Sequence, residues 1–136
     1  MKVLVLGKAT ERSESGELGT PDEFAAMDKF NQQLVEAGIV LAADGLQPTS
    51  KGKRVAFDAD GSHRVIDGPF AETKELVAGY SIWEVSSMDE AIEWARRSPV
   101  EGIVELRKIL DAEDFGEFAS EITAAEERSR AESAAT

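Results

Sequence analysis

Charged side chains surround a glycine–proline turn in residues 67–75, which read DGPFAETKE. The glycine permits backbone angles closed to other residues, and the proline stiffens the loop. Such a turn could hold Asp67 and Glu72 beside Lys74, either to orient a polar ligand or to tune a carboxylate through a nearby charge. In this interpretation Asp67 or Glu72 is a catalytic base, and Lys74 stabilises a developing anion. The alternative is a structural turn whose charged groups pair with one another and with backbone amides.

A second set of polar side chains lies on predicted strands. Glu105 and Arg107 are two residues apart and therefore share a face. Because charges in a central strand are costly unless paired, we expect them to pair with Asp44 or Lys74, or to line a pocket between sheet and helices. There Arg107 could hold a carboxylate or phosphate or stabilise an anion, whereas the alternative is a structural ion pair or a dimer contact. Tyr80 is a candidate hydrogen-bond donor, weak acid or core aromatic, and it joins Asp44, Glu105 and Arg107 as a candidate ligand-binding residue.

The remaining reactive residue types are scarce. The only histidine, His63, follows a predicted hairpin turn and is expected at the surface. One histidine and no cysteine exclude disulfides, thiolate nucleophiles and multi-histidine metal sites. The sequence contains no nucleotide-binding glycine loop, serine-hydrolase elbow or zinc-protease motif. Its scattered acids do not predict a convergent cation site, so we expect neither a metal nor a cofactor.

Composition narrows the class of protein. A chain of 136 residues, 42% hydrophobic and 31% charged, is typical of one soluble globular domain. Twenty-seven acidic against 15 basic residues give a net charge of −12, so we expect neither a nucleic-acid nor a membrane partner. No apolar run approaches the roughly 18 residues that span a bilayer. The N-terminal apolar run is also shorter than a signal peptide requires, which makes the cytoplasm the expected location.

Apolar patterns predict the elements that must position these residues. Core strands are predicted at residues 2–8, 39–43, 77–85 and 103–109, and a hairpin at residues 54–58 and 64–66. One helix is predicted from an N-cap at Thr20, with a capping box completed by Glu23, to Gly38. A second is predicted between a cap at Ser87 and Pro99.

The two least regular segments are assigned by composition. Residues 9–20 are predicted to be a flexible surface loop. The chain is predicted to divide into a folded domain at residues 1–112 and a C-terminal helix with an acidic tail at residues 113–136. That helix runs through Phe115, Phe118 and Ile122 and becomes solvated or frayed from Glu126 onward.

Without the hairpin, the order of elements is βαββαβ. This order predicts an α+β ferredoxin-like fold with a hairpin insertion. Right-handed crossovers place both helices on one face of such a sheet. The strands carry apolar side chains on both faces, so the other face would be a large exposed apolar patch. We therefore expect a homodimer in which a second copy covers that face.

Residues 67–75 resemble the signature of the DGPF, or YCII-related, family. The resemblance extends over about residues 1–109 and includes Ala43-Asp44-Gly45-Leu46, Gly79-Tyr80 and Glu105-x-Arg107. It departs from the family at Lys108, where the family has a proline, and at Met27, near which the wider group uses a histidine with an aspartate. The resemblance implies a dimeric α/β barrel and no established reaction. Its members beside or fused to sigma factors suggest a regulatory or stress-linked setting.

Two functional hypotheses follow. The first is an enzyme that acts on a small polar metabolite by carboxylate acid–base chemistry. The second is a ligand-binding or regulatory protein without turnover. A methionine cannot transfer a proton, so the departure at Met27 leaves Asp44 without a histidine partner and favours the second hypothesis.

Overall fold

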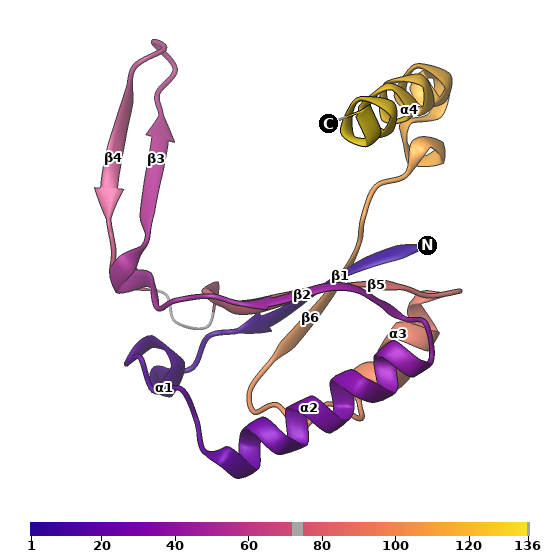
Figure 1. Cartoon of the computed structure of the whole chain (residues 1–136). Coiled ribbons are helices and arrows are strands. Elements are labelled where there is room, and N and C mark those ends of the chain that lie inside the picture. The colour runs from indigo at the N-terminus through magenta and orange to yellow at the C-terminus, as the bar shows by residue number, and fades with distance from the viewer. Residues whose placement is uncertain (72–74, 136) are drawn as a thin grey trace.

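A four-stranded sheet with helices on one face forms the body of the molecule (Figure 1). The computed structural model describes residues 1–71 and 75–135. The strands of the sheet are β1 (Lys2–Lys8), β2 (Val40–Gly45), β5 (Val77–Glu84) and β6 (Val104–Lys108). They lie in the order β2-β5-β1-β6, and every neighbouring pair is antiparallel. With α2 (Pro21–Glu36) and α3 (Met88–Ala95), this topology confirms the predicted ferredoxin-like α+β fold with a hairpin insertion.

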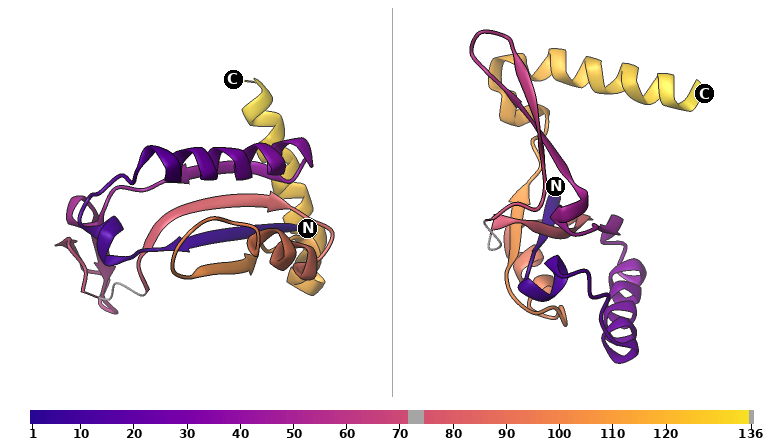
Figure 2. Two further views of the ribbon diagram at one scale, coloured as in Figure 1. Left: turned by 90° about the horizontal axis from the view of Figure 1, so that it is seen from below. Right: turned by 90° about the vertical axis from the view of Figure 1, so that its left-hand side faces the viewer.

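The hydrophobic core lies between the sheet and α2 and α3 (Figure 2). Val3 and Val5 point toward the helices because alternate side chains of a strand share a face. Leu34 of α2 is fully buried against them. Phe30 and Trp83 meet edge to face, with ring centroids 6.4 Å apart, a geometry that the ring quadrupoles favour.

Helix α2 begins and ends where the sequence predicts. The Thr20 hydroxyl accepts a hydrogen bond from the Glu23 amide at 3.2 Å, and Gly38 adopts φ +71 just after the helix. The predicted capping box forms only in part, because the Glu23 carboxylate binds Arg12 at 2.9 Å instead of the Thr20 amide.

The prediction of a flexible loop over residues 9–20 is wrong in part. This segment contains the short helix α1 (Glu11–Glu14). Thr10 and Ser13 each accept a hydrogen bond from the other's amide, at 3.1 and 2.8 Å. This reciprocal cap stabilises a single helical turn that has no apolar stripe by which it could be recognised in the sequence.

The insertion is a separate two-stranded hairpin of β3 (Lys53–Phe57) and β4 (His63–Asp67). It follows the 3-10 turn η1 (Thr49–Lys51), and Gly61 supplies the positive φ of +86 that its tip requires. The predicted hairpin is therefore confirmed. It rises from the face of the sheet opposite the helices, and we call residues 53–67 the hairpin arm (Figures 1 and 2).

The C-terminal segment forms a second projection on the same face. The 3-10 helix η3 (Ala112–Phe118) bends at Gly116 and leads into α4 (Ala119–Ala135). Of the solvated or frayed end predicted from Glu126, the structure shows the solvated alternative, because these residues are exposed but remain helical through Ala135. We call residues 112–135 the tail arm, which lies at the other end of the sheet from the hairpin arm (Figure 1). None of the described helices has the length and apolarity to cross a bilayer.

Between the two arms lies the face of the sheet that no helix covers, which we call the open face. Its central side chains are Leu4 and Leu6 of β1 and Tyr80 and Ile82 of β5, which the register places side by side. All four are half-buried within one chain. The sequence predicts apolar side chains on both faces of the sheet, and the open face has them at its centre.

Candidate functional site

A cleft of about 310 Å³ lies between α2 and the sheet. It exists because Gly7 of β1 and Gly79 of β5 are direct partners in the sheet, so no side chain rises from the floor at that point. The apolar part of the wall includes Val5, Met27, Phe30, Leu34, Trp83 and Val104. An apolar concavity of this volume is of the size that holds a small organic molecule.

Three uncharged polar side chains border this apolar wall. They are Asn31 of α2, Ser81 of β5 and Ser98, which follows α3. The indole nitrogen Nε1 of Trp83 is buried and has no hydrogen-bond partner among the described residues. A few polar groups placed around an apolar cavity give a ligand its orientation, because each buried group gains by being paired.

A second hollow of about 400 Å³ adjoins the cleft and shares Gly7, Met27, Gly79 and Val100 with it. Its polar wall centres on Arg12, whose guanidinium binds Glu17 and Glu23 at 2.9 Å each. The hydrogen bond to Glu23, followed by that to Glu17, raises the pKa of Arg12 above its ordinary value. Because both acids already engage this arginine, the hollow has little attraction for an anion.

Asp44 and Tyr80 are brought together as direct partners of β2 and β5. The Tyr80 hydroxyl donates a hydrogen bond of 2.8 Å to Asp44 Oδ2. Both residues border the cleft at the edge of the sheet, but the register directs their side chains to the open face with Leu6. The hydrogen bond, and then the negative charge of Asp44, raise the pKa of Tyr80 above its ordinary value.

Replacement of Asp44 with asparagine is expected to lower the pKa of Tyr80 toward the ordinary value of about 10. The reason is that tyrosinate no longer forms beside a carboxylate. In the native chain, the raised pKa of Tyr80 stabilises the folded state at pH values below the pKa that this group has in the unfolded chain. That stabilisation is lost as the pH rises through the higher pKa of the folded state. Tyr80 is the only tyrosine, so the rise of tyrosinate absorbance with pH reports this group alone. Identical titration curves for the two proteins would contradict the hydrogen bond.

Glu105 and Arg107 also lie on the open face, opposite Leu6 and Leu4 in the register. Glu105 binds Lys8 Nζ at 3.3 Å and lies 3.9 Å from Arg107 Nη1. Within the described part of the chain, the cationic partners of Glu105 are therefore Lys8 and, at longer distance, Arg107. Lys74, with which pairing was also predicted, lies outside the described residues. The side chains of Glu105 and Arg107 do not reach the cleft between sheet and helices.

The signature turn holds the base of the hairpin arm. Gly68 donates a hydrogen bond from its amide to the Gly52 carbonyl at 3.0 Å, and the Phe70 amide donates one to Thr49 Oγ1 at 3.1 Å. The Thr49 hydroxyl in turn donates a 2.5 Å hydrogen bond to Glu14 Oε2 of α1. These contacts connect the signature, η1 and α1 into one anchored corner.

Asp67, which the sequence predicts as a catalytic base, does not line the cleft. Asp67 is 74% exposed and binds Lys53 of the facing strand at 2.6 Å. The other two predicted catalytic residues, Glu72 and Lys74, lie outside the described residues. His63 is exposed on the hairpin, as predicted, beside the ring of Phe57. Among residues 1–71 and 75–135, no three histidine, aspartate or glutamate side chains converge as metal ligands.

The sequence interpretation missed Asn31, Ser81 and Ser98 because uncharged polar residues carry no pattern of their own. A signal was nevertheless present at Ser81. It shares a strand face with Trp83, so it places a hydroxyl on a buried face. Met27, the position near which the resemblance would place a histidine, lines both hollows.

Three comparisons relate this chain to known proteins. Residues 1–113 match the model of the YCII-related domain. An uncharacterised protein of Rhizobium meliloti (strain 1021) is 37% identical over 87 residues, which cover 61% of this chain and 69% of the relative. The solved structure of 5-chloro-2-hydroxyhydroquinone dehydrochlorinase from Burkholderia phenoliruptrix AC1100, in complex with 2,5-dihydroxybenzoquinone, aligns with 82% of this chain and 95% of its own at 14% identity and a TM-score of 0.44. The family match, which spans most of the chain, confirms the resemblance carried by residues 67–75: the chain belongs to the YCII-related family.

Proposed function

We propose that this protein is a homodimer that binds a small organic molecule in the cleft between α2 and the sheet of each subunit. The observation that carries the proposal is an apolar cleft of about 310 Å³ bordered by Asn31, Ser81 and Ser98. None of these three side chains is hydrogen bonded within the described part of the chain. They are therefore available to a ligand.

The lining determines the chemistry of that ligand. Phe30, Trp83 and Leu34 favour a flat or compact apolar body, because its burial releases water from both surfaces. The side chain of Asp44, the one charged residue of this lining, is directed to the open face by its pairing with Tyr80. An ionised ligand would consequently lose its hydration without gaining a counter-charge. The cleft fits a neutral compound with an apolar body and two or three hydrogen-bonding groups.

The second candidate function is catalysis by the carboxylates of the signature. The observation in its favour is Asp67 beside a lysine, since Lys53 could serve the role predicted for Lys74. Asp67 lines neither hollow, however, so it could not act on a molecule bound in the cleft. A general base must come within hydrogen-bonding distance of the proton it removes. Binding without turnover is for this reason the function that we favour, in either a metabolic or a regulatory setting.

The homodimer is supported by the open face. Leu4, Leu6 and Ile82 form its apolar centre, and the charged groups of Lys2, Lys8, Glu84, Glu105 and Arg107 surround it. An apolar centre within a polar rim is typical of a surface that another protein covers. A second copy presents the same face to the first, as a two-fold interface requires.

Screening of neutral aromatic and alicyclic compounds by thermal shift tests the binding proposal. For any compound that stabilises the protein, Asn31→Leu is expected to weaken binding about fivefold to tenfold, the value of one hydrogen bond. Ser81→Ala is expected to have a similar effect. The matched control is Gln33→Leu, the same change on an exposed position of α2.

The outcomes separate the two functions. Weaker binding by both cleft variants, unchanged binding by the control and no consumption of the compound would support binding without turnover. Consumption that Asp67→Asn abolishes would favour the signature enzyme instead. Equal binding by all the variants would place the ligand elsewhere and overturn the cleft proposal.

A further inference from the structure

We propose that the hairpin arm of each subunit packs on the tail arm of its partner. This inference rests on the homodimer proposed above and says how the two copies are oriented and held. It concerns the parts of the chain that the cleft and the sheet do not use.

The hairpin arm exposes an apolar face that no described part of its own chain covers. Val55 and Val65 are direct partners on that face, and Phe57 beyond them is 80% exposed. The arm is a two-stranded sheet that makes few contacts with other elements of the described chain. A lone two-stranded hairpin is marginally stable in water, so this arm gains from a surface to pack on.

The tail arm is unsupported in the same way. Phe118 is 57% exposed, and Leu110, just before the arm, and Phe115 are exposed as well. Helix α4 contains no buried residue, and its extensive contacts are confined to η3. An isolated helix of this length is marginal in water, and its stability in proteins comes from packing against other elements.

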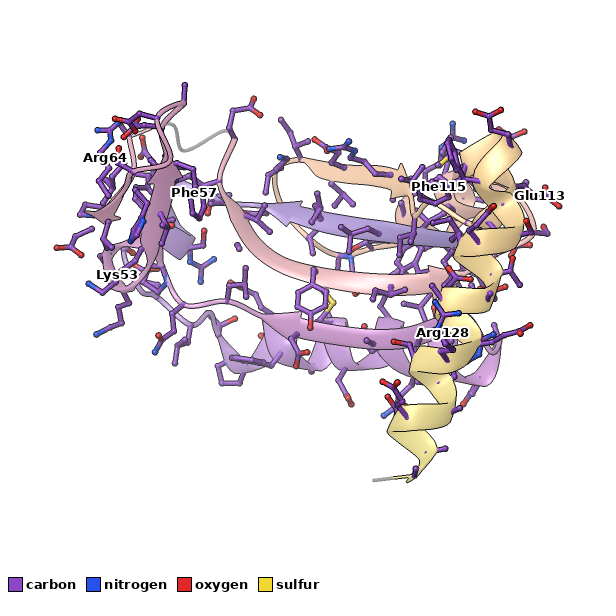
Figure 3. All side chains as sticks on the ribbon, turned by 90° about the horizontal axis from the view of Figure 1, so that it is seen from above. Lys53, Phe57, Arg64, Glu113, Phe115 and Arg128 are labelled. Carbon is purple, nitrogen blue, oxygen red and sulfur yellow. The ribbon has the colours of Figure 1, made fainter. Side chains whose placement is uncertain are left out.

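Both arms rise from the open face, at opposite ends of the strands. The hairpin arm joins the end of β2 to the start of β5, whereas the tail arm follows the end of β6. Because β5 and β6 both run antiparallel to β1, those two points lie at opposite ends of the sheet. Seen from above the open face, Phe57 and Phe115 lie on the sides of the two arms that are nearer the sheet (Figure 3).

Two-fold symmetry allows two ways to place a second copy on this face. An axis parallel to the strands brings hairpin to hairpin and tail to tail. An axis across the strands brings each hairpin arm to the partner's tail arm. Shape alone permits both, since in either case the partner's arms flank the first copy's sheet.

Charge distinguishes the two arrangements. Residues 111–135 contain eight acidic side chains against two arginines. The hairpin arm carries Lys53, Arg54 and Arg64 against Asp58, Asp60 and Asp67, so its formal charge is zero. Tail against tail would place two strongly negative segments together, whereas hairpin against tail places a neutral segment against a negative one. Avoided repulsion between the two tail arms thus favours the second arrangement.

Cysteine cross-linking tests the arrangement, because the native chain contains no cysteine. The Phe57→Cys, Phe118→Cys double variant, treated with a short bifunctional thiol reagent, is expected to give a covalent dimer in high yield. Each single variant is expected to give little. The matched control combines Phe57→Cys with Phe24→Cys, which introduces the second thiol at an exposed phenylalanine of α2, on the helix side of the sheet.

A charge substitution provides an independent measurement. His63→Glu, which puts a carboxylate beside Phe57 on the apolar face of the hairpin arm, is expected to weaken the dimer about fivefold at low salt, and Glu117→Arg in the same chain is expected to restore it. High salt should reduce both effects, since exposed charges are screened.

The outcomes distinguish this inference from the homodimer on which it rests. Cross-linking of the double variant with rescue by charge exchange supports the arm contact. A dimer in which single variants cross-link efficiently has like arms together and overturns the inference, as does a dimer in which no variant cross-links. A monomeric native protein at micromolar concentration overturns the homodimer itself.

Discussion

Replacement of Gly68 by alanine is expected to destabilise the protein by about 3 kcal/mol and to lower its Tm by about 10 °C. A Cβ at this position would lie 1.6 Å from the Thr49 carbonyl oxygen and 2.6 Å from the carbonyl carbon. Both atoms belong to the backbone, so no rotamer change relieves the clash. The turn must move away from η1, which breaks the hydrogen bond from the Gly68 amide to Gly52.

Calorimetry or thermal denaturation of two glycine variants measures this effect. Gly45→Ala is the matched control, because its new methyl group would meet no atom within 4 Å and its φ is ordinary. We expect that change to stay within about 0.5 kcal/mol. Asp67→Asn, which removes only an exposed ion pair with Lys53, is expected to cost less than about 1 kcal/mol. A Gly68→Ala protein as stable as the Gly45→Ala protein would contradict the anchoring role of the signature.

The expected loss of stability is larger for Gly68→Ala than for Asp67→Asn, and this difference changes the interpretation of the signature. The sequence draws attention to its acids and its lysine, because charge is visible in a string of letters. What the structure shows is a glycine that lets the chain pass against the backbone of Thr49. That neighbour lies 19 positions earlier, and no local pattern predicts which backbone segment approaches a turn. The sequence could therefore predict that this turn needs the conformational freedom of a glycine. It could not predict that another backbone segment lies in close contact with that glycine.

The fold was more predictable than the site for a similar reason. The strands and α2 follow from local periodicity and from the cap at Thr20, and those signals do not depend on distant residues. The ion pair between Lys8 and Glu105 depends instead on the register of β1 and β6, which joins residues almost a hundred positions apart. The cleft depends on two glycines that become partners only when β1 pairs with β5.

A Leu4→Asp variant is expected to be monomeric at concentrations at which the native protein forms the proposed homodimer. Leu4 lies at the centre of the open face, between Ile82 and Arg107 in the register. Each copy would lose the burial of a leucine, about 2 kcal/mol, and would desolvate a carboxylate. A two-fold interface contains the change twice. The dimer dissociation constant should therefore rise by at least about a thousandfold, which corresponds to about 4 kcal/mol.

Light scattering after size exclusion measures the state of assembly, and circular dichroism reports whether the variant is folded. Arg107 is directly opposite position 4, so it offers the new carboxylate a cationic partner in a folded monomer. The matched control is Val35→Asp, which adds the same charge at an exposed apolar position of α2, on the helix side of the sheet. If the open face is the interface, the control stays dimeric and the Leu4→Asp protein is a folded monomer. If the Leu4→Asp and Val35→Asp proteins dimerise with equal affinity, the interface does not lie on the open face, because burial of two carboxylates at its centre would weaken the dimer.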